Sequence, residues 1–286
     1  MVRDMSSHSL AGLSVAISGG ARGIGREIAV AFVDAGARVA IGDIAADAAQ
    51  ATATELGNGV VAYPLDVTDP DGFAHFLDQA EAALGPLDVL VNNAGIMPIG
   101  PFLAESDNVT DRVLDIDVRG VLTGTKLAGQ RFHERGAGHV VNIASIMGTL
   151  ASPNAASYCA AKFAIVGFGQ ALRQEWRGTG VHITTICPGF VRTELISGMK
   201  ANKAMEKLAM VDPDAVAAAV LAAIESGRSR QVFVPKSAAA IVKGSNTLPN
   251  DVRDTLFRLA GGNSVTETMD LEARAAYQSR VDGAVS

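Results

Sequence analysis

Cysteine and histidine are scarce in this sequence, and they do not cluster. The two cysteines, Cys159 and Cys187, are too few for a disulfide framework, and neither occurs in a metal-binding spacing. The five histidines are scattered along the chain. We therefore expect neither a disulfide-stapled secreted domain nor a protein-bound metal ion.

Charge and long apolar runs are also scarce. Only 19% of the residues are charged, and the net charge of -6 leaves no basic footprint for nucleic acid. No stretch approaches 18 uninterrupted apolar residues, and the N-terminus lacks the apolar core of a signal peptide. We therefore expect no nucleic-acid binding, no stable membrane insertion and a cytoplasmic location.

Apolar residues are plentiful but occur in short runs. With 286 residues, 48% of them hydrophobic, the chain can bury a sizeable core. Runs rich in Val and Ile alternate with segments of helical periodicity. The runs are 13–17, 38–41, 60–65, 87–91, 139–143, 181–186 and 231–234. This alternation predicts an α/β fold: a single doubly wound Rossmann domain, with a parallel sheet of about seven strands and helices on both faces.

The stretch 18–25, SGGARGIG, places four glycines directly after the first predicted strand and before an amphipathic helix at 24–35. Glycine lets a backbone approach a ligand closely, and the amide groups at a helix N-terminus attract phosphate. A flexible turn could have the same composition. The strand before it and the helix after it favour a site for a dinucleotide pyrophosphate.

Asp43 ends the second predicted strand, 18 residues after Gly25. A carboxylate at this spacing accepts hydrogen bonds from an adenosine ribose and repels a 2'-phosphate. The same residue could instead cap the helix predicted over 45–56. Asp43 therefore favours NAD over NADP without deciding between them.

Ser145, Tyr158 and Lys162 form the candidate catalytic group. The i, i+4 spacing of Tyr158 and Lys162 puts both on one helix face, where an ammonium should lower the pKa of the phenol toward neutrality. Tyr158 is then a candidate general acid and base, and Ser145 could hydrogen-bond a substrate oxygen. A Tyr-x-x-x-Lys pair alone would more often be an ordinary surface pair. Its combination with Ser145 and the glycine stretch favours catalysis.

Six ordered motifs make the sequence resemble the short-chain dehydrogenase/reductase family, in its subclass of roughly 250-residue chains, over about residues 11–235. The motifs are SGGARGIG at 18–25, Asp66-Val67, Asn92-Asn93-Ala94-Gly95, Ser145, Tyr158-x-x-x-Lys162, and PGFVRT at 188–193. All but the Tyr-Lys pair follow predicted strands. The glycine motif of that family usually begins with Thr, and Ser18 keeps its hydroxyl.

The resemblance implies an NAD-dependent oxidoreductase, with NADP less favoured. Tyr158 would transfer the proton, Lys162 would also bind the nicotinamide ribose, and Ser145 would orient the substrate oxygen. Asp66 and Val67 would hold the adenine. The residues implied to bind the cofactor are Ser18, Gly19, Arg22, Gly23, Ile24, Gly25, Asp43, Asp66, Val67, Asn93, Ala94, Gly95, Tyr158, Lys162, Pro188, Gly189, Val191 and Thr193.

Asp117 departs from the family pattern, in which an Asn is the fourth catalytic member. The matching stretch here is Asp117-Val118-Arg119-Gly120. In the family the main-chain carbonyl of this residue holds a water in a proton relay to the lysine, and Asp can keep that role. The amide donor is lost unless Asp117 is protonated. Asp117 either retains the relay with an altered pH dependence or is merely tolerated.

The predicted substrate walls are rich in methionine and other apolar residues, a composition that suits a pliable apolar pocket. They include a lid at about 190–210. We therefore expect a hydrophobic secondary alcohol or ketone, such as a lipid, steroid or terpenoid, although ordinary packing of a helical lid would leave the same pattern. The predicted pocket residues are Ile96, Met97, Met147, Leu150, Phe190, Leu195 and Met199.

Three segments are predicted: an N-terminal segment at 1–10, a catalytic domain at 11–235 and a helical extension at 236–286. The extension should form two short helices, the second starting at a capping box, Ser264-x-x-Glu267. We expect it to pack on its own subunit or across an oligomer interface. The family resemblance implies a homodimer or homotetramer through helices at about 110–135 and 155–177.

Two other functions compete with a dehydrogenase. A non-catalytic regulator that senses dinucleotides would keep the fold, but the intact Ser145, Tyr158 and Lys162 argue against it. A nucleotide-sugar epimerase of the longer subclass is disfavoured because that subclass has a different glycine spacing and a larger substrate domain.

Overall fold

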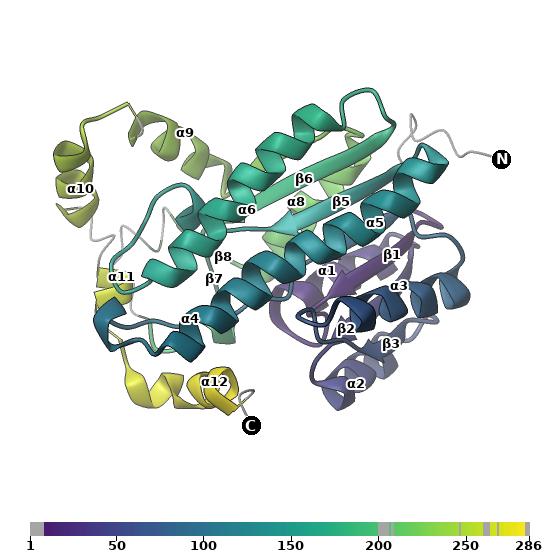
Figure 1. Cartoon of the computed structure of the whole chain (residues 1–286), viewed down its shortest axis with the longest axis horizontal. Helices are drawn as coiled ribbons and strands as arrows, with labels where there is room; N and C mark the ends of the chain where they lie inside the picture. The colour runs from purple at the N-terminus through teal and green to yellow at the C-terminus, as the bar shows by residue number, and fades with distance from the viewer. Residues whose placement is uncertain are drawn as a thin grey trace.

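The computed structural model is built on a seven-stranded parallel sheet with the order β3-β2-β1-β4-β5-β6-β9 (Figure 1). It describes residues 9–199, 206, 209–245, 247–259, 264–267 and 269–283. The predicted doubly wound fold is confirmed, and each predicted strand lies within about two residues of an observed one. The strands are β1 Ser14–Ser18, β2 Arg38–Asp43, β3 Val61–Pro64, β4 Val89–Asn92, β5 Gly138–Ile143, β6 Val181–Pro188 and β9 Arg230–Val234.

Helices cover both faces of this sheet because successive strand residues point to opposite sides. Val15 and Ile17 face Ile28 and Phe32 in one core, beneath α1 Gly23–Asp34, α2 Ala46–Leu56 and α8 Pro213–Glu225. The opposite core, which contains Leu90, lies beneath α3 Pro70–Leu84, α5 Val121–Arg135 and α6 Ala156–Glu175. The strands are therefore buried on both sides, as their continuous apolar runs predict.

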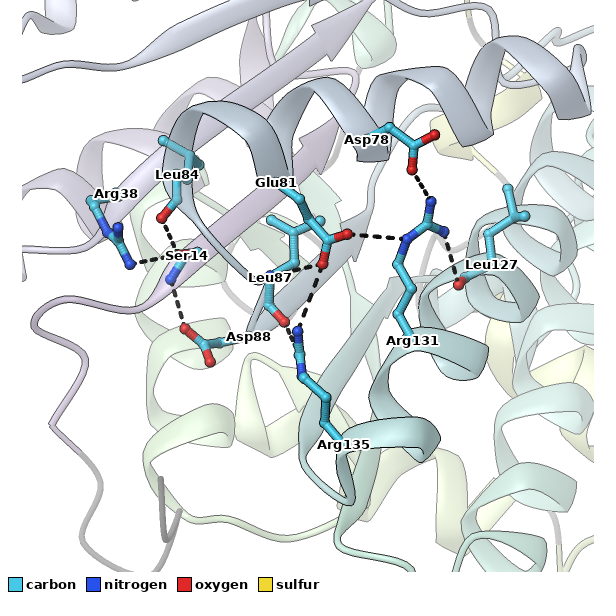
Figure 2. A network of polar contacts seen from close by, with 10 residues as sticks. All are labelled: Ser14, Arg38, Asp78, Glu81, Leu84, Leu87, Asp88, Leu127, Arg131 and Arg135. Atoms are coloured by element: carbon cyan, nitrogen blue, oxygen red, sulfur yellow. Dashed lines mark hydrogen bonds and ion pairs between the residues drawn. The ribbon is translucent and has the colours of Figure 1, made fainter. Parts of the chain in front are cut away.

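A polar network at the amino ends of the strands fixes the helices of the second face (Figure 2). The Ser14 amide donates to Asp88 at 2.9 Å. Glu81 of α3 pairs with Arg131 at 3.3 Å and with Arg135 at 3.6 Å, both on α5. These contacts join α3 and α5 near the amino ends of the strands. The carboxyl ends of the strands, on the opposite side of the sheet, remain available for a ligand.

The segment between β4 and α5 contains an irregular helix. After the short turn η1 Phe102–Ala104 come α4 Asp107–Leu114, the π-helical turn η2 Asp115–Gly120 and then α5. The sequence predicts one long helix at about 110–135 and gives no sign of the π turn. Such turns are rare and are often found at functional sites.

The C-terminal extension contains four helices in the described residues, so the prediction of two is wrong. They are α9 Lys236–Ser245, α10 Asn250–Leu259, α11 Ser264–Glu267 and α12 Leu271–Gly283. The predicted capping pair lies within the single turn α11, and Met269 forms a bridge with Met199 that separates this turn from α12. Among the described helices, none has the length and apolarity to cross a bilayer.

Candidate active site

A cleft of about 330 Å³ lies at the carboxyl ends of the strands, where the chain order of the sheet reverses between β1 and β4. Its volume falls within the range of small-molecule sites. The predicted cofactor and catalytic residues that line it are Gly19, Arg22, Gly23, Ile24, Asp43, Asp66, Val67, Asn93, Ala94, Gly95, Asp117, Ser145, Tyr158, Lys162, Pro188, Gly189, Val191 and Thr193.

Ser18 and Gly25 do not line the cleft but shape the loop that does. The Ser18 hydroxyl accepts hydrogen bonds from the amides of Asn93 at 3.1 Å and Ala94 at 3.2 Å. A Cβ on Gly25 would overlap the Gly19 carbonyl oxygen, so this position requires glycine. The loop after β1 is thereby pressed against the loop after β4.

The N-terminus of α1 faces the cleft without a side-chain cap. Arg22 is the N-cap residue and makes no capping hydrogen bond, while Gly23 and Ile24 of the first turn line the cleft. The first amides of a helix have no partners within the helix. This end of α1 therefore fits a phosphate group.

Asp43 joins the end of β2 to the glycine loop. One carboxylate oxygen accepts from the Ala21 amide at 3.1 Å, and the other accepts from the Ala45 amide at 3.0 Å. The N-cap of α2 is Ala45, so Asp43 does not occupy the capping position itself. Asp66, further along the same edge, accepts from the backbone and hydroxyl of Thr68.

Tyr158 and Lys162 lie side by side on α6, and both are almost fully buried. The Lys162 ammonium is 5.5 Å from the centre of the Tyr158 ring and donates to the Ile143 carbonyl at 3.3 Å. Ser145 follows β5, and its hydroxyl accepts from the Met147 amide at 3.1 Å. The predicted catalytic residues are therefore gathered in one place by α6 and the end of β5.

The Asp117 side chain takes part in this group directly. Its carboxylate is fully buried in the π turn, 3.0 Å from the Lys162 ammonium, and it accepts from the Ile96 amide at 2.8 Å. The family pattern alone points to the main-chain carbonyl of this residue and to the lost amide donor. The Lys162 ammonium and the Ile96 amide favour the charged carboxylate, but burial is the larger effect, and the pKa of Asp117 is raised above its ordinary value.

The pKa of Tyr158 is raised, which contradicts the predicted fall toward neutrality. Burial is the largest cause; Lys162 acts in the predicted direction and Asp117 acts against it, so the net shift of the Tyr158 pKa is upward. Burial lowers the pKa of Lys162, but Asp117 and Tyr158 outweigh this and raise the Lys162 pKa. The phenol of Tyr158 is therefore held in its neutral form beside a charged lysine.

Apolar side chains from several loops form the opposite side of the cleft. Met97, Met147 and Phe190 are buried in one cluster with Tyr158. The predicted pocket residues that line the cleft are Ile96, Met97, Met147, Phe190 and Leu195. The lid predicted at 190–210 includes β7 Phe190–Val191, η4 Glu194–Ile196 and β8 Met210–Val211, while its residues 200–205, 207 and 208 lie outside the described residues.

Two predicted pocket residues are not in the lining. Leu150 lies in a separate hollow with Phe163 and Arg253, because the turn η3 Ile146–Gly148 carries the chain away from the cleft. Met199 packs against the apolar cluster but forms a bridge with Met269 of the extension. Both residues therefore lie outside the described lining of the cleft.

The sequence analysis misses several residues of the lining. Tyr277 comes from α12, and Arg112 and Ile116 come from the helix that contains the π turn. No motif marks Tyr277, which the fold brings to the cleft from near the C-terminus. Arg112 lies five residues and Ile116 one residue before Asp117, and neither spacing puts two side chains on one face of a regular α-helix, so no signal in the sequence marks them.

A short-chain dehydrogenase family model matches residues 14–204. The chain is 35% identical over 261 residues to the probable oxidoreductase EphD of Mycobacterium tuberculosis, covering 84% of this chain and 44% of the relative. It is 36% identical over 242 residues to the D-threitol dehydrogenase of Mycolicibacterium smegmatis, covering 80% of this chain and 88% of that relative. It is also 36% identical over 189 residues to a 3-alpha-(or 20-beta)-hydroxysteroid dehydrogenase of Mycobacterium tuberculosis, with 66% and 73% covered.

The chain spans less than half the length of the first of these relatives, and most of the other two. The family match covers the glycine loop, Ser145 after β5, and Tyr158 and Lys162 on α6. On this match, and on the seven-stranded parallel sheet that carries it, the chain belongs to the short-chain dehydrogenase family.

Proposed function

We propose that the chain is an NAD-dependent oxidoreductase that interconverts a secondary alcohol and a ketone. The observation that carries this proposal is the meeting of Tyr158, Lys162 and Ser145 in one cleft with an uncapped helix N-terminus. The required glycine at 25 and the carboxylate of Asp43 fit a dinucleotide along the glycine loop. When bound, the nicotinamide supplies or accepts the hydride.

In the reducing direction, Tyr158 donates its phenolic proton to the substrate oxygen. A raised Tyr158 pKa keeps that proton in place until the substrate oxygen gains charge. Ser145 donates a hydrogen bond to the same oxygen, and the Lys162 ammonium stabilises the phenolate that is left. Asp117 keeps Lys162 charged through their 3.0 Å ion pair. In the oxidising direction the same groups act in reverse.

Asp43 supports NAD rather than NADP as the preferred cofactor. Its carboxylate lies at the end of β2 and lines the cleft, where it would repel a 2'-phosphate. Titration with NADH and NADPH, followed by nucleotide fluorescence, should give a lower Kd for NADH. Asp43→Ser should narrow or reverse this preference, and a preference unchanged by that variant would contradict the assignment.

An apolar substrate is supported by Met97, Met147 and Phe190, which line the side of the cleft next to Tyr158. One relative is a hydroxysteroid dehydrogenase and another a D-threitol dehydrogenase, so these two relatives favour different substrates. A panel of bulky apolar alcohols and small polyols decides between them. Faster turnover of the polyols would reject the apolar substrate.

Assembly, location and domain division are proposals of the same kind. Leu122 of α5 and Phe163 of α6 are exposed apolar residues on the helices implied to join subunits, which supports a homodimer or homotetramer. Sedimentation of the purified chain tests this.

We also propose a cytoplasmic location, and a catalytic domain at 11–235 followed by an extension at 236–286.

A non-catalytic dinucleotide sensor is the alternative. The first experiment is therefore a titration with NADH followed by turnover assays on the alcohol panel. Binding with turnover would support the dehydrogenase. Binding without turnover of any alcohol or ketone would favour the sensor, and would direct attention to Asp117, which replaces the usual Asn of the family.

A further inference from the structure

The extension after β9 returns to the cleft and contacts three loops that surround the substrate side. The first is the loop between η3 and α6. The Ser152 and Thr266 hydroxyls lie 3.0 Å apart, and the Asn154 side-chain amide donates to the Thr266 carbonyl at 3.2 Å. The turn α11 is thereby attached just before the helix that carries Tyr158.

The second contact joins the extension to the end of the described lid. The Asp270 amide donates to the Gly198 carbonyl at 2.8 Å, next to the bridge between Met199 and Met269. Gly198 has φ +78, and a Cβ there would overlap the Asp270 carbonyl oxygen. Only glycine lets these two segments approach so closely.

Arg274 is the central contact. This side chain is 2% exposed, and its guanidinium donates to the carbonyls of Leu195 at 2.9 Å, Ser197 at 3.3 Å and Met97. One buried residue of α12 thus holds the loop after β4 and the lid after β6 together. A planar fork of donors suits this task, since each carbonyl is satisfied without a second side chain.

Tyr277 completes the contact from the next turn of α12. Its hydroxyl accepts from the Met97 amide at 2.8 Å, and its ring lies 4.6 Å from the Arg274 guanidinium. Both backbone groups of Met97 are therefore bonded to α12. Tyr277 also lines the cleft, together with Met97 and Tyr158.

We propose that Tyr277 is a specificity-determining residue whose side chain contacts the substrate, and that Arg274 is a positioning residue that sets the width of the cleft. This inference rests on the proposed oxidoreductase function and names the wall of its substrate site that α12 supplies. The wall is aromatic and rigid, since Met97 is fixed at both its amide and its carbonyl. A rigid wall does not yield to a ligand that is wider than the cleft, so the site should bind apolar cyclic ketones up to a limiting size and reject larger ones.

The test measures binding and turnover separately. A series of cyclic ketones of increasing size is titrated into the complex with NAD+, which gives a Kd for each ketone without reaction, and kcat/KM is measured with NADH. The variants are Tyr277→Phe, Arg274→Met and Arg274→Lys. Tyr63→Phe is the matched control, because Tyr63 is not among the residues that line the cleft and its hydroxyl donates to the Gln79 carbonyl at 3.5 Å.

Arg274→Met should weaken binding of the small ketones by about tenfold or more and remove most of the preference against large ones. Arg274→Lys should retain part of the preference against large ketones that Arg274→Met loses. Tyr277→Phe should accelerate hydrogen exchange at the Met97 amide and change the ketone Kd by about two- to tenfold. NADH affinity should stay within about twofold of the wild type in all of these, and Tyr63→Phe should change nothing.

Some outcomes would overturn the inference. A lower Tm with an unchanged order of ketone Kd values would leave Arg274 a merely structural residue. A Tyr277→Phe variant with unchanged ketone binding and unchanged exchange at Met97 would remove Tyr277 from the wall. Failure of the proposed function is distinct: the wild type would bind NADH and these ketones without turning them over, and the size preference in Kd would still decide the role of α12.

Discussion

The two sides of the cleft are built differently. On the cofactor side, the sheet itself brings the contacts together: Ser18 meets Asn93, and Asp43 meets Ala21, at the ends of neighbouring parallel strands. On the substrate side, Met97 is fixed by Arg274 and Tyr277, which lie 177 and 180 residues away along the chain. The cofactor side thus depends on the sheet, whereas the substrate side depends on a helix outside it.

Tyr158→Phe should give the largest effect, because Tyr158 lies where the two sides meet. Phe keeps the ring and loses the proton, so kcat should fall by about 10²- to 10⁴-fold. The NADH Kd should change little. Steady-state kinetics with a nucleotide titration check this, with Tyr63→Phe as the control. Turnover within a few-fold of the wild type would reject Tyr158 as the proton donor.

Gly25→Ala should disturb the cofactor side alone. The new Cβ would overlap the Gly19 carbonyl oxygen and force the glycine loop to shift, at a cost of about 1–3 kcal/mol, or about 5- to 150-fold in NADH Kd. Nucleotide titration measures this. Gly167→Ala on α6 is the control, since a Cβ there meets nothing within 4 Å and should be neutral or stabilising.

The ketone Kd order should be the same in Gly25→Ala as in the wild type. A change in that order would mean that the two sides are coupled through the loop after β4. The cofactor side and the substrate side would then not bind their ligands independently, although they are built from different elements.

The same difference explains what the sequence can predict. Short Val- and Ile-rich runs identify strands because buried parallel strands need them. Once the strands are placed, residues at their carboxyl ends must meet, so Asp43 and Ser145 are predictable as neighbours of one cleft. The Tyr158 and Lys162 pair is predictable from its spacing on one helix face.

The substrate side has no such rule. The sequence predicts Leu150 in the pocket because it belongs to the segment after a strand, but a single 3-10 turn is enough to carry it into a separate hollow. Arg274 and Tyr277 satisfy backbone groups of loops, and a backbone carbonyl leaves no mark in the sequence. The raised Tyr158 pKa also escapes prediction, because it depends on how deeply the ring is buried.

Asp117→Asn should have a smaller and more specific effect, on pH dependence. The negative charge of Asp117 raises the pKa of Tyr158, and it is the main group that raises the pKa of Lys162. The Asn variant removes this charge. Both pKa values should therefore fall. The pH profile of kcat/KM for alcohol oxidation should move to lower pH, because Tyr158 must be ionised to act as the base.

Asp115→Asn is the matched control for this change. Asp115 lies two residues earlier in the same helical segment and pairs with Arg119 on the surface. Its pH profile should follow that of the wild type. An unchanged profile in Asp117→Asn would mean that Asp117 is merely tolerated at this position.

His139→Gln should leave both sides of the cleft unchanged and affect only stability in acid. His139 is fully buried at the amino end of β5, bonded to the Thr184 hydroxyl at 2.9 Å. Burial, followed by His182 and Arg230, lowers the pKa of His139 to about 3. The folded chain thus binds this proton less readily than the unfolded chain, whose histidine pKa is about 6.5. The stability that depends on neutral His139 is complete above about pH 6.5 and is lost as the pH falls toward 3.

Between pH 7 and pH 5, this linkage amounts to about 2 kcal/mol in the free energy of unfolding. Urea unfolding at the two pH values should therefore show that the free energy of unfolding falls further in the wild type than in His139→Gln, by about that amount. His75→Gln, at an exposed site on α3, should follow the wild type. Equal losses in His139→Gln and the wild type would mean that His139 is protonated within the folded sheet. His139 lies at the amino end of its strand, whereas the cleft lies at the carboxyl ends. The Kd values for NADH and for the ketones at pH 7 should therefore equal those of the wild type in both variants.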